Sequence, residues 1–217
     1  MRLKEKYDKI LEWFSENMPS AKSELNYSTP FELLVAVVLS AQCTDKRVNI
    51  VTPALFKAFP TANEMSKSSV DEILHYISSI SYPNNKAKHL LGLSQVLVEK
   101  FSGEVPNDIE KLQMLPGVGR KTANVVMAVA FNKPAMPVDT HVFRVSHRLG
   151  LVPSTATTPL AVEKKLVKNI PTELLADAHH WLLLHGRYVC KAIKPDCNNC
   201  GINLYCSLEQ KKNKKIK

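Results

Sequence analysis

Four cysteines near the C-terminal end of the chain have the type and spacing of a metal site. They follow the pattern C-x6-C-x2-C-x5-C. Four thiolates this close together can bind one soft metal centre, and both zinc and an iron–sulfur cluster suit such a set. The intervening segment is rich in Pro, Asp, Asn and Gly, which favours an irregular loop able to fold around the centre. The spacing alone leaves the two metals open for Cys190, Cys197, Cys200 and Cys206.

Disulfide bonds are a third use for these cysteines, and the rest of the sequence argues against it. The first nine residues are charged and lack a secretory signal, and the longest apolar run, Leu33–Leu39, is too short to span a bilayer. We therefore expect a cytoplasmic, reducing setting, in which thiols bind metal rather than pair.

A second group of chemically capable residues lies at Leu112–Ala123, where Leu-Pro-Gly-Val-Gly-Arg-Lys-Thr separates two apolar segments. Two glycines so close together predict a tight turn, which leads into the next helix. Backbone N–H groups at such a helix start can bind an anion, with Gly117 and Gly119 allowing close approach. Lys121 falls off the apolar face of that helix and so can face outward. It could be a nucleophile or one more lysine that contacts phosphate.

Asp139 is the third candidate, in the segment Val138–Val145. It follows Pro137 and precedes an amphipathic stretch, so its simplest role is that of a helix N-cap. A capping carboxylate is held in place and kept ionised, and both properties suit an electrostatic or general-base role.

The overall charge favours a polyanionic partner. The 217 residues carry a formal net charge of +9, and the sequence pI is about 9.3. Five lysines among the last seven residues, 211–217, predict a solvated tail that touches phosphate loosely. The hydrophobic fraction of 45% is enough to bury one large core or two smaller ones.

The elements that must position these residues are helical almost throughout, and no convincing strand pattern is present. The run 33–41 is apolar on all sides and predicts a buried central helix. A change near 132–134 predicts a crossing between two helical lobes, and a last long helix over about 172–188 leads to Cys190. Helix starts are predicted at Thr29–Glu32, Ser69 with Glu72, Asn107 with Glu110, and Thr158-Pro159.

Taken together, these motifs resemble the endonuclease III family, which belongs to the helix-hairpin-helix superfamily of DNA glycosylases. The resemblance covers nearly the whole chain: residues 38–42, 115–123, 138–144, 179–181, 185–187 and the four cysteines. It implies an all-α fold with two helical lobes, a cleft between them and a C-terminal cluster loop. The lobes would comprise residues 22–133 and residues 1–21 with 134–217. It also implies that the four cysteines hold a 4Fe–4S cluster.

The resemblance also implies roles for single residues. Lys121 matches the catalytic nucleophile and Asp139 the catalytic carboxylate, while Gln42 matches the residue that enters the space left by an extruded base. In one loop the chain departs from the family, because Gly-Leu-Tyr-Asn is replaced by Ser81-Tyr82-Pro83-Asn84. Tyr82 then stands at the position where the family has a leucine that acts as a second wedge. Tyr82 would take this role, unless its side chain packs inward. DNA contacts are expected from Gln42, Tyr82, Gly117, Gly119, Arg120, Lys191 and Lys194.

The implied activity is that of a monomeric, bifunctional glycosylase and abasic-site lyase, acting on oxidised pyrimidines in duplex DNA. An amine suits this chemistry because only an amine forms a Schiff base with the sugar after the damaged base has been flipped out. An adenine-specific mismatch glycosylase is the nearest competing function, but that branch lacks a lysine at the position of Lys121. A non-enzymatic DNA-binding module and a redox protein that uses the cluster for electron transfer are two further candidate functions.

Overall fold

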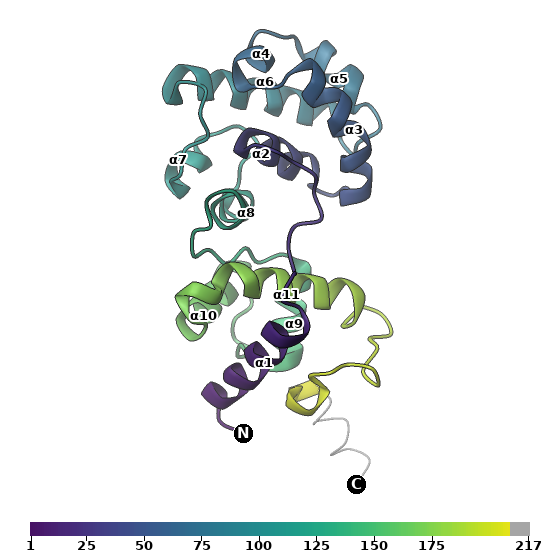
Figure 1. Cartoon of the computed structure of the whole chain (residues 1–217), viewed down its shortest axis with the longest axis vertical. Helices are drawn as coiled ribbons and strands as arrows, with labels where there is room; N and C mark the ends of the chain where they lie inside the picture. Colours follow the sequence, from purple (N-terminus) through teal and green to yellow (C-terminus); the bar gives the residue numbers. More distant parts are fainter. Residues whose placement is uncertain (209–217) are drawn as a thin grey trace. The chain divides into compact units, whose positions relative to one another are not determined.

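The computed structural model describes residues 1–208, which form helices and loops and contain no strand (Figure 1). The lysine-rich tail at 211–217 lies outside the described residues. The helices are α1 (Leu3–Asn17), α2 (Pro30–Leu39), α3 (Asp45–Ala58), α4 (Ala62–Ser66), α5 (Val70–Ile77), α6 (Pro83–Phe101), α7 (Ile109–Gln113), α8 (Arg120–Phe131), α9 (Thr140–Leu149), α10 (Pro159–Asn169), η1 (Thr172–Leu174), α11 (Leu175–Tyr188) and η2 (Asn203–Tyr205).

The chain divides into two compact units, each with a hydrophobic core of its own. One unit is Ser23–Lys133, and the other combines Met1–Lys22 with the described chain from Pro134 on. The first unit contains α2 to α8, and the second contains α1 and α9 to α11. Each candidate residue can therefore be placed within the packing of its own unit.

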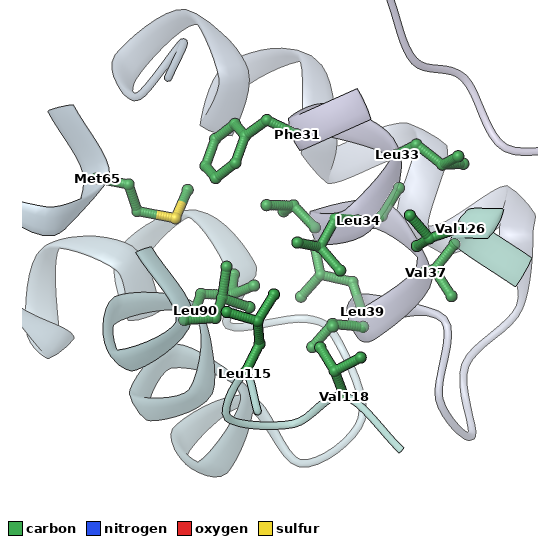
Figure 2. Packing of buried hydrophobic residues seen from close by; sticks show 14 of the residues in the cluster. Phe31, Leu33, Leu34, Val37, Leu39, Met65, Leu90, Leu115, Val118 and Val126 are labelled. Atoms are coloured by element: carbon green, nitrogen blue, oxygen red, sulfur yellow. The ribbon is translucent and has the colours of Figure 1, made fainter. Parts of the chain in front are cut away.

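Helix α2 is the centre of the first unit, as its uniformly apolar sequence predicted. Every residue from Leu33 to Leu39 is buried, with at most 3% of its surface exposed. Figure 2 shows side chains of α2 packed with Leu90 of α6 and Val126 of α8, and with Leu115 and Val118 from the turn before α8. Because these last two side chains are buried in the core, the turn between them is held in one place.

The predicted helix starts are mostly confirmed, and one of them is shifted. Thr29, Ser69 and Thr158 are N-caps whose side chains accept a backbone N–H, and Ser69 with Glu72 completes a capping box. The prediction at Asn107 is wrong, because Asp108 is the N-cap of α7 and accepts the N–H groups of Glu110 and Lys111. An ionised carboxylate one residue further on can satisfy two free N–H groups of the first turn.

Two predicted helix boundaries also differ from the structure. Helix α2 ends at Leu39 rather than at Ala41, and Ala41 is exposed in the turn that follows. The predicted long helix over 172–188 begins as the short 3-10 helix η1 and continues as α11.

The second unit is built on the packing of α9 against α11, with α1 alongside (Figure 1). Phe14 of α1 stacks on Trp181 of α11 with ring centroids 5.9 Å apart. Gly186 lets α9 and α11 approach closely, since a Cβ there would lie 2.9 Å from the Cβ of His141. This packing fixes α9, which carries Asp139 at its start, against the helix that leads to Cys190.

Candidate active site and cysteine loop

The glycine turn between α7 and α8 is held by its own packing. Gly117 has a φ of +78°, and a Cβ at this position would lie 2.9 Å from the Cβ of His89 on α6. Both the left-handed backbone and the close approach require glycine. With Leu115 and Val118 buried on either side, the turn presents the start of α8 at a fixed position.

Lys121 lies in the first turn of α8 and is exposed, beside an open stretch of backbone. Gly119, the N-cap, has an ordinary φ of −86°, and a Cβ there would meet no atom within 4 Å. Gly119 has no side chain to cap this helix start, and no side-chain cap is found there among residues 1–208. Ala123 and Val126 are buried on the opposite side of the helix, so Lys121 points away from the core, as predicted. Open backbone next to an exposed amine leaves room for a ligand to approach both.

Asp139 is the N-cap of α9, as the sequence predicted. One of its carboxylate oxygens, Oδ1, accepts the backbone N–H of Val142 at 2.8 Å. Val138 and Val142 on either side are buried, whereas the carboxylate is only partly buried. The group is therefore fixed by the backbone and is still accessible to a reactant.

Two arginines on α9, Arg144 and Arg148, donate hydrogen bonds to backbone carbonyls near the end of α11 and in the loop that follows it. Arg144 donates to the carbonyl of Gly186 at 2.8 Å and to that of Cys190 at 3.2 Å. Arg148 donates to the carbonyls of Lys191 at 2.6 Å and Ala192 at 2.9 Å. Sequence reasoning missed both residues, although their spacing of four on an amphipathic helix could have indicated a shared face.

The four cysteines line a single pocket, together with Arg148, Leu149 and His185 and residues of the loop itself. Among the described residues, none of the four cysteines forms a disulfide bond, and the pocket that they line is partly open to solvent. Within residues 1–208, no three His, Cys, Asp or Glu side chains lie close enough together to hold a single metal ion. The structure thus places the four cysteines around one pocket, but at separations too large for three of them to bind one ion.

Burial sets the protonation of two groups at this pocket. It lowers the pKa of His185 to about 4, and it raises the pKa of the Cys200 thiol to about 11. The Nε2 atom of His185 lies 3.7 Å from the sulfur of Cys200. At neutral pH this histidine is uncharged, and a bare thiol at Cys200 keeps its proton unless a cation favours the thiolate.

Lys191 and Lys194 are exposed on the loop between the first two cysteines. Arg148 holds the backbone of this loop at Lys191 and Ala192, and Lys194 adopts a left-handed φ of +50°. The two ammonium groups extend into solvent from a loop whose backbone is fixed.

Gln42 and Tyr82 both lie at exposed turns of the first unit. Gln42 follows α2 with a φ of +54°, and Tyr82 precedes α6 with a φ of +55°. Tyr82 is 64% exposed, so it does not pack inward. Non-glycine residues in this backbone region are uncommon, and such strain is found preferentially at functional sites.

Residues 35–172 match the family model described as "HhH-GPD superfamily base excision DNA repair protein". The chain is 50% identical over 199 residues to endonuclease III of Rickettsia felis, covering 92% of each protein. It is 46% identical over 202 residues to endonuclease III of Escherichia coli K12, covering 93% of this chain and 95% of the relative. The chain belongs to the endonuclease III family. This membership makes it a base excision repair glycosylase and abasic-site lyase, which confirms the predicted family and enzyme class.

Solved structures agree with the all-α endonuclease III fold. A trapped endonuclease III–DNA covalent intermediate, 45% identical, superposes with a TM-score of 0.91 and covers 98% of this chain and 100% of the other. A non-covalent endonuclease III–DNA complex, 44% identical, gives the same TM-score. A thermostable thymine-DNA glycosylase, 24% identical with a TM-score of 0.87, shares the fold. None of the helices in the described part of the chain is long and apolar enough to cross a membrane.

Proposed function

We propose that this enzyme excises oxidised pyrimidines from duplex DNA and cuts the strand at the resulting abasic site, with Lys121 as the nucleophile. The observation that carries the proposal is the exposed amine of Lys121 in the first turn of α8, next to the open backbone at Gly119. One related solved structure is a trapped endonuclease III–DNA covalent intermediate, which fits a mechanism through a covalent adduct.

The chemistry begins with a damaged base flipped out of the stack. The neutral amine of Lys121 attacks C1′ of the deoxyribose, the bond from C1′ to the base breaks, and the base leaves with the bonding electrons and takes up a proton. The sugar ring then opens: the C1′–O4′ bond breaks, O4′ takes up the proton that the amine nitrogen loses, and the C1′=N imine that forms acidifies the 2′ proton. Loss of that proton drives β-elimination, in which the C3′–O bond breaks and the 3′ phosphate leaves. Asp139 assists proton loss from the amine or stabilises positive charge on the sugar.

A duplex with one thymine glycol tests this function. We expect the strand to be cut on the 3′ side of the lesion, with release of the base. Base release without a cut would instead indicate a monofunctional glycosylase such as the mismatch branch. Binding without either reaction would indicate a non-enzymatic DNA-binding module.

Contacts to DNA are proposed at three places. Gly117, Gly119 and Arg120, in the turn before α8 and at its first residue, would contact phosphate, because the positive end of the helix dipole favours an anion there. Lys191 and Lys194 would contact phosphate from the cysteine loop. Gln42 and Tyr82 would fill and wedge the gap that an extruded base leaves in the stack.

The loop lysines give a prediction on salt dependence. Lys191→Ala or Lys194→Ala should weaken binding to every DNA sequence and reduce the slope of log K against log salt by roughly one, since each removes one phosphate contact. Fluorescence anisotropy on two unrelated duplexes over a salt series measures this. Lys168→Ala, on α10, provides a matched surface control with an unchanged slope. A loss confined to one sequence, with the slope unchanged, contradicts a phosphate contact.

The exposed Tyr82 ring gives a prediction on lesion excision. Stacking of an aromatic ring on a base contributes roughly 1–3 kcal/mol, so Tyr82→Ala should slow excision of a stacked lesion by about tenfold. Cleavage at a ready-made abasic site should slow much less, because less stacking is broken there. Single-turnover rates on the two substrates test this. Equal effects on both rates, or no effect on either, would show that Tyr82 is not the wedge.

We propose that Cys190, Cys197, Cys200 and Cys206 hold a 4Fe–4S cluster. In support, the four side chains line one pocket, and within residues 1–208 no three of them lie close enough together to hold a single ion, which suits a larger group. Bound there, the cluster would fix the loop that carries Lys191 and Lys194.

The cluster predicts iron in the purified protein. Protein from iron-replete cells should be yellow-brown and contain about four irons per chain. Cys206→Ser should lose iron and lower the melting temperature, whereas Cys43→Ser, at the free cysteine of the other unit, should keep the full iron content. Colorimetric iron assay and visible absorption measure this. Stoichiometric zinc in place of iron would contradict the assignment.

We further propose that the two lobes of the fold comprise residues 22–133 and residues 1–21 with 134–217. The enzyme would act as a monomer in the cytoplasm, associated with the nucleoid through DNA binding. The basic composition supports this location.

A further inference from the structure

Lys86 is a buried lysine that lies between the Gln42 turn and the Tyr82 turn. It belongs to the first turn of α6, and 6% of its surface is exposed. Its ammonium group donates to the carbonyl of Leu39 at 2.8 Å and to that of Ala41 at 2.7 Å. Burial lowers the pKa of this amine, and the nearby Cys43 partly offsets that shift. Burying a lysine costs free energy unless its ammonium group is hydrogen-bonded, so the contacts of a buried lysine indicate what it does in the structure.

The same residue is hydrogen-bonded to the backbone of Tyr82 and to the backbone of Ala41, the residue before Gln42. Its own N–H donates to the carbonyl of Tyr82 at 3.2 Å, while its ammonium reaches Ala41, directly before Gln42. The backbone N–H of Lys86 therefore holds the turn at Tyr82, and its ammonium group holds the backbone directly before Gln42. The two segments are about forty residues apart in the sequence, and Lys86 joins them directly.

Both of the joined positions have a backbone that needs support. Gln42 and Tyr82 have φ values of +54° and +55°. A non-glycine residue in this region is disfavoured and persists only where its surroundings hold it. The ammonium also lies at the C-terminal end of α2, where a positive charge interacts favourably with the unpaired carbonyls.

We propose that Lys86 is a positioning residue for base extrusion. It holds the turns at Gln42 and Tyr82 in a fixed position relative to each other, so that both side chains enter the DNA base stack together. The inference rests on the proposed wedge role of these two residues. It assigns Lys86 no contact with DNA and no part in the covalent chemistry at Lys121. Its effect should therefore appear in the step that removes a stacked base and be absent from cleavage of a preformed abasic site.

The test compares Lys86→Met with a matched control in the other unit, using the full-length enzyme. Lys6 is also buried, with 7% of its surface exposed, and its ammonium donates to the carbonyl of Leu149 at 3.0 Å, at the end of α9. Lys6→Met thus removes a similar helix-end contact away from the wedge residues. Single-turnover rates are measured on duplexes containing thymine glycol or a preformed abasic site. A 2-aminopurine beside the lesion reports unstacking by its fluorescence.

We expect Lys86→Met to lower the ratio of lesion excision to abasic-site cleavage by about tenfold, and to reduce the rise in 2-aminopurine fluorescence. Lys86→Arg, which keeps a cationic donor, should restore part of the ratio. Lys6→Met should lower the melting temperature and leave the ratio unchanged. Added to the double variant Gln42→Ala and Tyr82→Ala, Lys86→Met should lower the ratio little further, because it acts through those residues.

Three results overturn the inference. If Lys86→Met slows both reactions by the same factor, or if Lys6→Met changes the ratio equally, Lys86 is only a structural residue. If Lys86→Met leaves the ratio unchanged while Gln42→Ala and Tyr82→Ala lower it, the wedge role stands and the positioning role fails. If the two alanine variants leave the ratio unchanged, the wedge role fails and the inference fails with it, whereas the nucleophilic role of Lys121 is untouched.

Discussion

Lys121→Gln is expected to abolish the protein–DNA adduct that borohydride traps from the native enzyme. Glutamine has no amine, so no imine can form at C1′ for borohydride to reduce. Strand cleavage should fall by roughly 10³-fold or more, as for loss of other catalytic nucleophiles. Binding to abasic DNA should persist, because Lys121 is exposed and its loss leaves the buried face of α8 intact. Gel electrophoresis after borohydride treatment and anisotropy on a reduced abasic duplex measure the two properties.

Lys111→Gln is the matched control for this experiment. Lys111 is exposed on α7, in the same hairpin as Lys121, and carries the same charge. It should form the adduct in full yield. An undiminished adduct with Lys121→Gln would refute the nucleophile assignment, and a loss of adduct that only matches a loss of binding would indicate a phosphate-contacting lysine.

Asp139→Asn is expected to slow the chemical step by about 10²–10⁴-fold and to change DNA affinity little. The loss corresponds to removal of a general base or of a charge that stabilises the transition state. Asparagine caps a helix about as well as aspartate, and its carbonyl oxygen can still accept the N–H of Val142. The variant therefore removes the charge and keeps the fold, so single-turnover rates and binding constants separate catalysis from structure.

Two further variants complete the Asp139 test. Asp108→Asn changes the aspartate that caps α7 in the same way and should leave both rate and affinity nearly unchanged. Asp139→Ala should in addition lower the free energy of unfolding by about 1 kcal/mol, because the cap is lost. If Asp139→Asn lowers rate and affinity by the same factor, Asp139 is a structural cap and not a catalytic group.

Local patterns predicted much of the fold correctly. Prolines and capping residues at Thr29, Ser69 and Thr158 set the helix starts, since they act on the first turn that follows them. The capping role of Asp139 and the outward direction of Lys121 followed from the same local rules. The start at Asn107 was wrong because Asn and Asp are both good caps, and the sequence does not rank adjacent candidates.

The residues that support the site were not predicted, because their partners are distant in the sequence. Arg148 bonds to carbonyls at Lys191 and Ala192, and Lys86 bonds to carbonyls at Leu39 and Ala41. Every residue has a backbone carbonyl, so the sequence does not show which carbonyl accepts a hydrogen bond from a given lysine or arginine. The exposure of Tyr82 likewise depends on how the turn before α6 is oriented by the packing of its unit.

The sequence by itself determined the family and the helical class, and it is the source of the proposed catalytic and metal-binding residues. These proposals follow from residue type, because an amine can form an imine, a carboxylate can transfer a proton and four thiols can bind a metal centre. Only the tertiary structure decided that the four thiols share one pocket, that Gly119 leaves open space beside Lys121, and that Lys86 joins two strained turns. These properties depend on how the backbone folds and packs in three dimensions, and packing of the whole unit sets them.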